Sequence, residues 1–281
     1  MIKIIRSVES MKKLSDGFRE KGLSIGFVPT MGYLHDGHLS LVKEAKRQND
    51  LVVVSIFVNP TQFGPREDLK KYPRDLKRDL KILSKYKVDM VFHPSAGEMY
   101  PDVYKTCIEV KGLSDKLCGA SRPGHFKGVT TIVAKLFNIV KPDTAYFGEK
   151  DYQQQVIIKK MVKDLNMGVK IVSMPTIREK DGLAMSSRNK YLNKDERAKA
   201  LVINKALKFA KVLVKSGVKS SARIRAAMTK LMRTAKYLKI DYVSICDPET
   251  LDEKRTVKGK TLIATAVYVG RTRLVDNIVI K

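Results

Sequence analysis

Short apolar runs alternate with longer amphipathic stretches through the N-terminal part of the chain. The short runs predict buried strands at 24–28, 51–58, 88–92, 144–147 and 168–173, with a further short strand over 106–110. Apolar residues three and four positions apart predict helices at 7–21, 39–47, 74–87 and 129–140, and another helix begins at 152. Such alternation is typical of the α/β class, so we expect a Rossmann-like, doubly wound, mostly parallel sheet.

The pattern changes after Pro175. Two amphipathic stretches at 195–216 and 221–236 predict helices, and three apolar runs at 241–246, 262–269 and 274–280 predict strands. Two helices followed by three strands form an α+β pattern. We therefore predict two domains, an N-terminal one over 1–176 and a smaller α+β one over 177–281.

A loop with two glycines and two histidines connects the strand at 24–28 to the next helix. Gly32 and Gly37 let the backbone turn sharply and approach a ligand closely. The loop ends at a helix N-terminus, where free N–H groups and the helix dipole attract anions. His35 and His38 share one face if the first turn includes both. We interpret the loop as a polyphosphate site; ordinary loop histidines and a metal site, which has no third ligand nearby in sequence, are the alternatives.

Polar loops also follow later strands, at the edge of a parallel sheet where ligands bind. Asn59 and Gln62 carry amides that can bind a small polar ligand or satisfy the backbone of their own turn. Lys150 stands in a turn before a helix and is well placed for phosphate, with a solvated turn lysine as the alternative.

Composition and charge limit the classes of protein that the chain can belong to. It has 281 residues, of which 43% are hydrophobic, and a formal net charge of +26. This charge raises nucleic-acid binding as a hypothesis. However, the basic residues are scattered, often beside acids as in 74–79, so we interpret most of them as solvated surface. Three widely spaced cysteines and no apolar run of about 20 residues favour a cytoplasmic protein.

Two sequence motifs together resemble those of the nucleotidylyltransferase superfamily, which includes class I aminoacyl-tRNA synthetases. His-x-Gly-His at 35–38 is similar to its first phosphate motif. Met-Ser-Ser-Arg at 185–188 is similar to its second, Lys-Met-Ser-Lys-Ser in synthetases. Ala184 replaces the first lysine, and Arg188 brings the cation instead.

Over essentially its full length the chain resembles one family, the pantoate–β-alanine ligases (pantothenate synthetases). The motifs that carry the resemblance follow one another in the chain: Pro-Thr-Met-Gly-x-Leu-His-x-Gly-His, Asn-Pro-x-Gln-Phe-Gly, Tyr-Pro-Arg, Glu-Met-Tyr-Pro, Arg-Pro-Gly-His-Phe-x-Gly-Val, Phe-Gly-x-Lys-Asp-x-Gln-Gln, Met-Ser-Ser-Arg-Asn and Thr-Arg-Leu-Val-Asp-Asn.

The resemblance implies a two-step reaction of pantothenate and coenzyme A biosynthesis. ATP, with Mg2+, and pantoate form pantoyl adenylate and pyrophosphate, and the β-alanine amine then attacks the adenylate to give pantothenate and AMP. It also implies a homodimer with small-molecule substrates and neither a nucleic-acid nor a membrane partner. The rival interpretations are another nucleotidylyltransferase and a basic nucleic-acid-binding protein.

The resemblance also assigns roles to residues. His38, as proton donor, His35 and Lys150 are the expected catalytic residues. Gln62 and Gln154 are expected at pantoate, and Gln62 also at β-alanine. No residue is assigned as a metal ligand. The expected ATP-binding residues are Met31, Gly32, Tyr33, Leu34, His35, Asp36, Gly37, His38, Gly148, Glu149, Lys150, Asp151, Ile177, Met185, Ser186, Ser187 and Arg188. The segment 185–188 is expected to close over the site as a lid.

Overall fold

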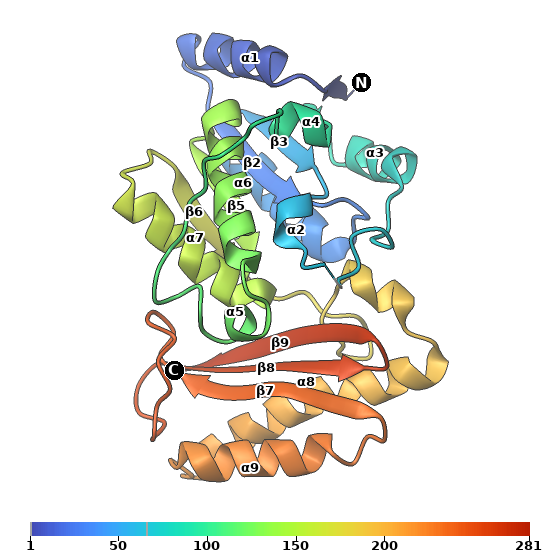
Figure 1. Cartoon of the computed structure of the whole chain (residues 1–281), viewed down its shortest axis with the longest axis vertical. Coiled ribbons are helices and arrows are strands. Elements are labelled where there is room, and N and C mark those ends of the chain that lie inside the picture. Colours follow the sequence, from blue (N-terminus) through green and yellow to red (C-terminus); the bar gives the residue numbers. More distant parts are fainter. Residues whose placement is uncertain (1, 66) are drawn as a thin grey trace.

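The structure is a computed structural model that describes residues 2–65 and 67–281. It contains a six-stranded sheet and a separate three-stranded sheet (Figure 1). All pairings in the larger sheet are parallel. Its strands, in spatial order, are β1 (Lys3–Ile5), β4 (Met90–Phe92), β3 (Leu51–Ile56), β2 (Ile25–Thr30), β5 (Thr144–Gly148) and β6 (Lys170–Met174). The predicted α/β fold class is confirmed.

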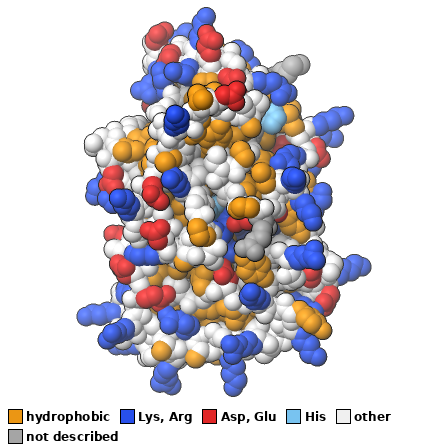
Figure 2. Space-filling model, in the orientation of Figure 1, with side chains coloured by type: hydrophobic (Ala, Val, Ile, Leu, Met, Phe, Trp, Pro, Cys, Tyr) orange, Lys and Arg blue, Asp and Glu red, His pale blue; other side chains and the backbone are white. Residues whose placement is uncertain are grey.

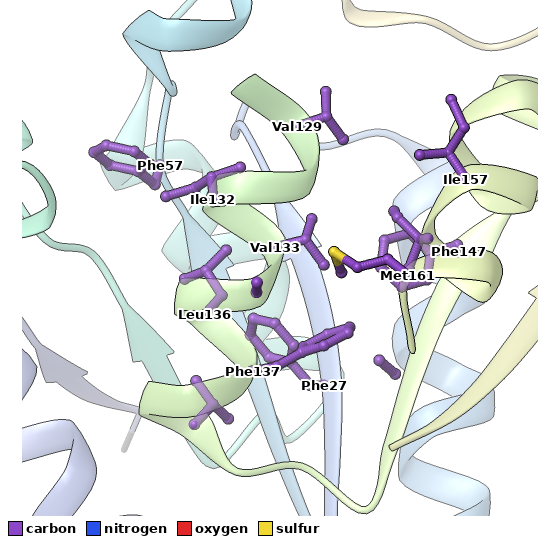
Figure 3. Close-up of a cluster of buried hydrophobic side chains, with 14 of the residues drawn as sticks. Phe27, Phe57, Val129, Ile132, Val133, Leu136, Phe137, Phe147, Ile157 and Met161 are labelled. Atoms are coloured by element: carbon purple, nitrogen blue, oxygen red, sulfur yellow. The ribbon is translucent and has the colours of Figure 1, made fainter. Parts of the chain in front are cut away.

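Helices cover both faces of the larger sheet, as in a doubly wound fold. One face packs against α1 (Val8–Glu20), α6 (His125–Val140) and α7 (Tyr152–Asp164). In that layer Phe27 of β2 lies edge-on to Phe137 of α6, with ring centroids 6.3 Å apart (Figure 3). The other face packs against α2 (Asp36–Gln48) and α3 (Leu76–Lys85). Two apolar layers therefore hold the sheet on which the site is built.

The smaller sheet is antiparallel and has its own core. Its strands β7 (Leu238–Cys246), β8 (Thr261–Val269) and β9 (Thr272–Ile280) pair in that order. Helices α8 (Lys194–Lys215) and α9 (Ser221–Met232) pack on the face that lies away from the larger sheet (Figure 1). No helix among the described residues has the length and apolarity needed to cross a membrane.

Strand order fixes where a ligand can bind. The chain order reverses between neighbouring strands β2 and β5, since β3 and β4 lie on one side of this pair and β6 on the other. The loops that follow the two strands diverge there and leave a crevice at their carboxyl ends. These loops hold the two predicted phosphate segments, residues 31–38 and Gly148–Asp151.

The strand predicted over 106–110 is wrong, because hydroxyl groups replace the strand partner. Ile108 N–H donates to Thr131 Oγ1 (2.9 Å), and Ile108 O accepts from Thr130 Oγ1 (2.6 Å). Strand β1 and the short helices α4 (Ala96–Met99) and α5 (Cys118–Ser121) were not predicted. Helix α6 also begins at His125, four residues earlier than predicted, after Gly124 in a left-handed conformation with φ of 80°.

Candidate active site

The loop after β2 is held by hydrogen bonds to the ends of strands β2 and β3. Thr30 Oγ1 accepts the N–H of Gly32 (3.1 Å) and donates to Ser55 O (2.7 Å) on β3. Gly32 and Tyr33 both have positive φ, 81° and 51°. A non-glycine residue seldom adopts this conformation unless its surroundings enforce it. The loop is therefore a tight, constrained turn.

Asp79 of α3 provides that constraint. Its carboxylate accepts the N–H groups of Tyr33 (2.7 Å) and Leu34 (2.9 Å), and its side chain is 1% exposed. Burial raises the pKa of this carboxyl above its ordinary value. Neighbouring Arg78 donates to Leu34 O (2.9 Å) and lies over the Tyr33 ring. Arg78 and Asp79 are therefore not merely solvated charges, because both bind the loop.

The two histidines begin helix α2 and fix each other. His35 is the N-cap residue, and its Nδ1 accepts the N–H of Gly37 (3.2 Å). His38 Nδ1 accepts the N–H of His35 (3.3 Å), which closes a reciprocal capping box. A side chain at position 37 would collide with the His35 ring, since an added Cβ would lie 2.9 Å from it. The two ring centroids are 4.1 Å apart.

This arrangement determines the protonation of the rings. Because each Nδ1 accepts a hydrogen bond, a neutral ring carries its proton on Nε2. Burial, aided by Lys150, lowers the pKa of His35 to about 4. Burial and the neighbouring His35 and Lys150 hold the pKa of His38 well below its ordinary value. At neutral pH the pair therefore presents two uncharged Nε2–H donors at a helix N-terminus.

The turn after β5 carries the lysine. Residues Glu149–Asp151 form a short 3-10 helix between β5 and α7. The Lys150 side chain is 19% exposed, and its ammonium lies 3.4 Å from Asp151 Oδ1. The carbonyl groups of Glu149 and Lys150 both accept from Asn277 of β9 (2.9 and 3.0 Å).

The segment 185–188 contacts the histidine loop directly. Ser187 Oγ donates to Tyr33 O (3.2 Å), and an added Cβ at Gly37 would lie 3.7 Å from Met185 Cβ. Arg188 donates through Nε and Nη2 to the carboxylate of Asp68 (2.9 and 2.8 Å). The two phosphate motifs, about 150 residues apart in sequence, are therefore adjacent in the structure.

A cavity of about 1320 Å³ lies between the two sheets. It brings together five of the predicted residues: Lys150, Asp151, Gln154, Ser186 and Arg188. His35, His38 and Gln62 are not among its described lining residues. Met185 and Ser187 stand against the histidine loop.

The predicted glutamines Gln154 and Gln62 lie in different places, and Gln154 differs from its neighbour Gln153, whose amide is already hydrogen-bonded. Gln154 is half-buried and lines the cavity. Gln153 is occupied, since its amide donates to Leu113 O (2.9 Å) and Lys116 O (2.6 Å). Gln62 follows β3, and its Nε2 lies 3.0 Å from Met31 Sδ in the histidine loop.

Several predicted ATP-binding residues can contact a ligand only in part. The Leu34 side chain is fully buried in the core, so only its backbone is available. Asp36 is exposed at the start of α2. The carbonyl of Ile177 already accepts the N–H of Met185 (3.0 Å), which closes a small hairpin over 177–185.

Sequence reasoning missed Asp79, Asp68, Asp276 and Asn277. A signal for Asp79 was present, because it stands three residues after Leu76 and four before Leu83, on the apolar face of α3. An acid on such a face is a buried carboxylate that needs partners. The other three act through contacts between distant segments, which no local pattern reveals.

These features define a class of protein. A parallel α/β sheet with a histidine loop at a helix N-terminus beside its switch point, and a second loop of serines and arginine against it, is typical of nucleotide-binding α/β enzymes. The chain belongs to the pantoate–β-alanine ligase family, whose model matches residues 3–279.

Individual relatives agree over the whole chain. The pantothenate synthetase of Moorella thermoacetica is 52% identical over 280 residues, which are 100% of this chain and 99% of that protein. The crystal structure of pantothenate synthetase from Thermus thermophilus superimposes with a TM-score of 0.92 at 43% identity and covers 99% of both chains. The ligase of Francisella tularensis, complexed with β,γ-ATP and β-alanine, gives a TM-score of 0.82 at 38% identity and covers 99% of this chain and 97% of that one.

The lowered histidine pKa values predict a pH-dependent stability. Burial also lowers the pKa of His125 to about 4, whereas an unfolded histidine titrates near 6.5. Between these pKa values the unfolded chain binds more protons than the folded chain. The free energy of unfolding therefore falls as the pH drops from about 6.5 toward 4, and above about pH 6.5 it does not depend on these histidines.

Urea denaturation at several pH values between about 6.5 and 5 measures this slope, above the range of most carboxylates. The matched variant His125→Asn keeps an N–H donor for Gln62 O, which His125 Nδ1 contacts at 2.8 Å, but cannot titrate. Its slope should be smaller than that of the wild type. A flat wild-type curve, or equal slopes, would contradict the assignment of neutral imidazoles.

Proposed function

We propose that the protein condenses pantoate with β-alanine at the expense of ATP, through a pantoyl-adenylate intermediate, and releases AMP and pyrophosphate. One observation carries the assignment of the site: the Ser187 hydroxyl contacts the backbone of the histidine loop. Membership of the ligase family supplies the reaction. The relative complexed with ATP and β-alanine supports these substrates.

In the first step a carboxylate oxygen of pantoate attacks the α-phosphorus of ATP, and the bond to the β-phosphate oxygen breaks. Negative charge grows on the departing pyrophosphate. His35 and His38 donate from Nε2 to these oxygens, while Lys150 and Arg188 add positive charge and Ser186 and Ser187 add hydroxyl donors. Rate enhancement by such groups comes mainly from positioning and from electrostatic stabilisation of the transition state.

In the second step the β-alanine amine attacks the acyl carbon of pantoyl adenylate. The C–O bond to AMP breaks, an amide bond forms, and the amine loses a proton. Gln62 and Gln154 hold pantoate in both steps, and Gln62 also contacts β-alanine. The segment 185–188 is assigned as a lid that closes over the bound nucleotide, which its contact with Tyr33 of the histidine loop supports.

Magnesium enters as part of the ATP substrate. Among residues 2–65 and 67–281, no group of three or more His, Cys, Asp or Glu side chains is arranged to hold a metal ion. Magnesium is commonly bound through substrate phosphates and one or two carboxylates. Asp151, 53% exposed beside Lys150, fits such a limited role.

The proposal includes a cytoplasmic homodimer. Family resemblance is its support, and light scattering at micromolar concentration tests it; a monomer would contradict it.

Nucleic-acid binding is the rival function that the net charge suggests. Figure 2 shows Lys and Arg side chains spread over the visible face with acidic side chains among them, instead of one basic patch. Such a surface should bind nucleic acid weakly and lose that binding steeply with salt.

The first prediction from this function concerns partial reactions. Labelled pyrophosphate should exchange into ATP when pantoate and magnesium are present, without β-alanine and without tRNA, because adenylation is complete before the amine arrives. The control reactions replace pantoate with amino acids. Equal exchange with an amino acid, or none with pantoate, would refute the assignment.

The second prediction separates the half-reactions. Lys150 is assigned to phosphates that leave in the first step, so Lys150→Ala should impair formation of pantoyl adenylate. With preformed pantoyl adenylate and β-alanine, its rate should stay within about tenfold of wild type, roughly 1.4 kcal/mol.

Gln62→Ala is the matched comparison, since its amide is assigned to pantoate and should affect both steps. Rapid-quench kinetics measures each step. If Lys150→Ala slows both steps equally, Lys150 holds the acyl adenylate itself, and the division between phosphate and pantoate groups is wrong.

A further inference from the structure

Strand β9 connects the smaller sheet to both phosphate segments. It is the edge strand of that sheet and lies on the side toward the larger sheet (Figure 1). Its residues Asp276 and Asn277 are 3% and 8% exposed. They belong to the motif Thr-Arg-Leu-Val-Asp-Asn, for which the reaction described above gives no role. Two adjacent buried polar side chains need partners, and the partners found are the turns that carry the cations of the site.

Asn277 binds the lysine turn. Both N–H bonds of its amide are used, on the consecutive carbonyl groups of Glu149 and Lys150 (2.9 and 3.0 Å). A 3-10 turn has poorer internal hydrogen bonding than an α-helix, so an external donor on two successive carbonyls fixes its orientation. The direction in which the Lys150 side chain leaves the backbone is thereby set from the other sheet.

Asp276 binds the hairpin that precedes the second phosphate motif. Its carboxylate accepts two hydrogen bonds from the Arg178 guanidinium (2.6 and 2.9 Å). Arg178 also donates to Gly182 O (3.2 Å) across the hairpin. The hairpin closes with the bond from Met185 N–H to Ile177 O, and Ser186, Ser187 and Arg188 follow at once. A paired fork of this kind is rigid as well as strong.

We propose that Asp276 and Asn277 are positioning residues for adenylation. Asn277 orients the Lys150 turn, and Asp276 orients the hairpin that presents residues 185–188. Both residues line the cavity, and each is assigned here to act through the cationic segment that it binds. The inference rests on the proposed function of Lys150, and it makes the smaller sheet part of the machinery of the first step.

The decisive variant is Asn277→Leu, which has a similar volume and no donor. Displacement of a catalytic group by about 1 Å costs up to 10²-fold in rate, so we expect adenylation to slow by about 10–100-fold. The second half-reaction should stay within about threefold of wild type. Rapid-quench kinetics measures both steps, and thermal midpoints confirm that each variant is folded.

Lys116→Met is the matched control. Lys116 Nζ donates across the same interface between the two sheets, to Thr250 O (2.7 Å) and Asp252 Oδ1 (2.8 Å), but it does not touch the lysine turn. Both half-reactions of this variant should remain within about twofold of wild type. A loss of adenylation equal to that of Asn277→Leu would overturn the proposal, because loosened docking would then explain both.

A double-mutant cycle shows whether Asn277 acts through Lys150. Added to Lys150→Ala, the change Asn277→Leu should slow adenylation by less than about twofold more, because the group that it positions is already gone. Full multiplication of the two effects, or equal slowing of both half-reactions by Asn277→Leu, would overturn the proposal.

If Asn277→Leu does not fold, Asn277→Ser provides the test, since one hydroxyl donor remains. The adenylation rate of Asn277→Ser should be lower than the wild-type rate but no lower than about a tenth of the wild-type rate. An unchanged rate would overturn the inference. Failure of the proposed function and failure of this inference give different results. Normal adenylation by Lys150→Ala refutes the proposed role of Lys150. Impaired Lys150→Ala with normal Asn277 variants refutes this inference alone.

Discussion

The backbone of the loop after β2 turns back on itself through two residues with positive φ, which leaves two N–H groups pointing into the protein. Asp79 accepts both of them. A buried N–H without an acceptor would cost about as much as a lost hydrogen bond, so this carboxylate and the shape of the loop depend on each other. With the turn fixed, His35 falls at the N-cap of α2 and His38 three residues on, and the two rings lie side by side. Every later feature of the site is arranged around that pair.

In the proposed reaction the site relies on oriented hydrogen-bond donors and on cations that are paired with acids, instead of on a cluster of unpaired positive charges. Of the arginines that line the cavity, Arg188, Arg122 and Arg273 are each paired with an acid, namely Asp68, Glu67 and Asp241. Beside the cavity, Arg178 is paired with Asp276. The imidazoles are neutral because burial disfavours their charged form.

Local patterns were sufficient to predict the α/β class, and they indicated which polar residues follow the ends of strands. Apolar runs mark the strands because a parallel sheet is buried on both faces. His35, His38 and Lys150 became candidates because they follow buried strands at the edge of the sheet where ligands bind, and the family resemblance then assigned their roles. The strand over 106–110 failed because its β-branched pattern could not show that Thr130 and Thr131 supply its hydrogen bonds. Asp276 and Asn277 stand in the motif Thr-Arg-Leu-Val-Asp-Asn but had no assigned role, since their partners lie about 100 or more residues away and only the docking of the two sheets reveals them.

The central claim is that both imidazoles are uncharged and carry their proton on Nε2. Long-range proton–nitrogen correlation spectra of the protein with ¹⁵N-labelled histidine report charge and tautomer for each ring, and the variants His35→Asn and His38→Asn assign the signals. The account predicts neutral Nε2–H forms for both rings at pH 7, retained to about pH 5. A charged ring at pH 7, or a neutral ring with its proton on Nδ1, would contradict it.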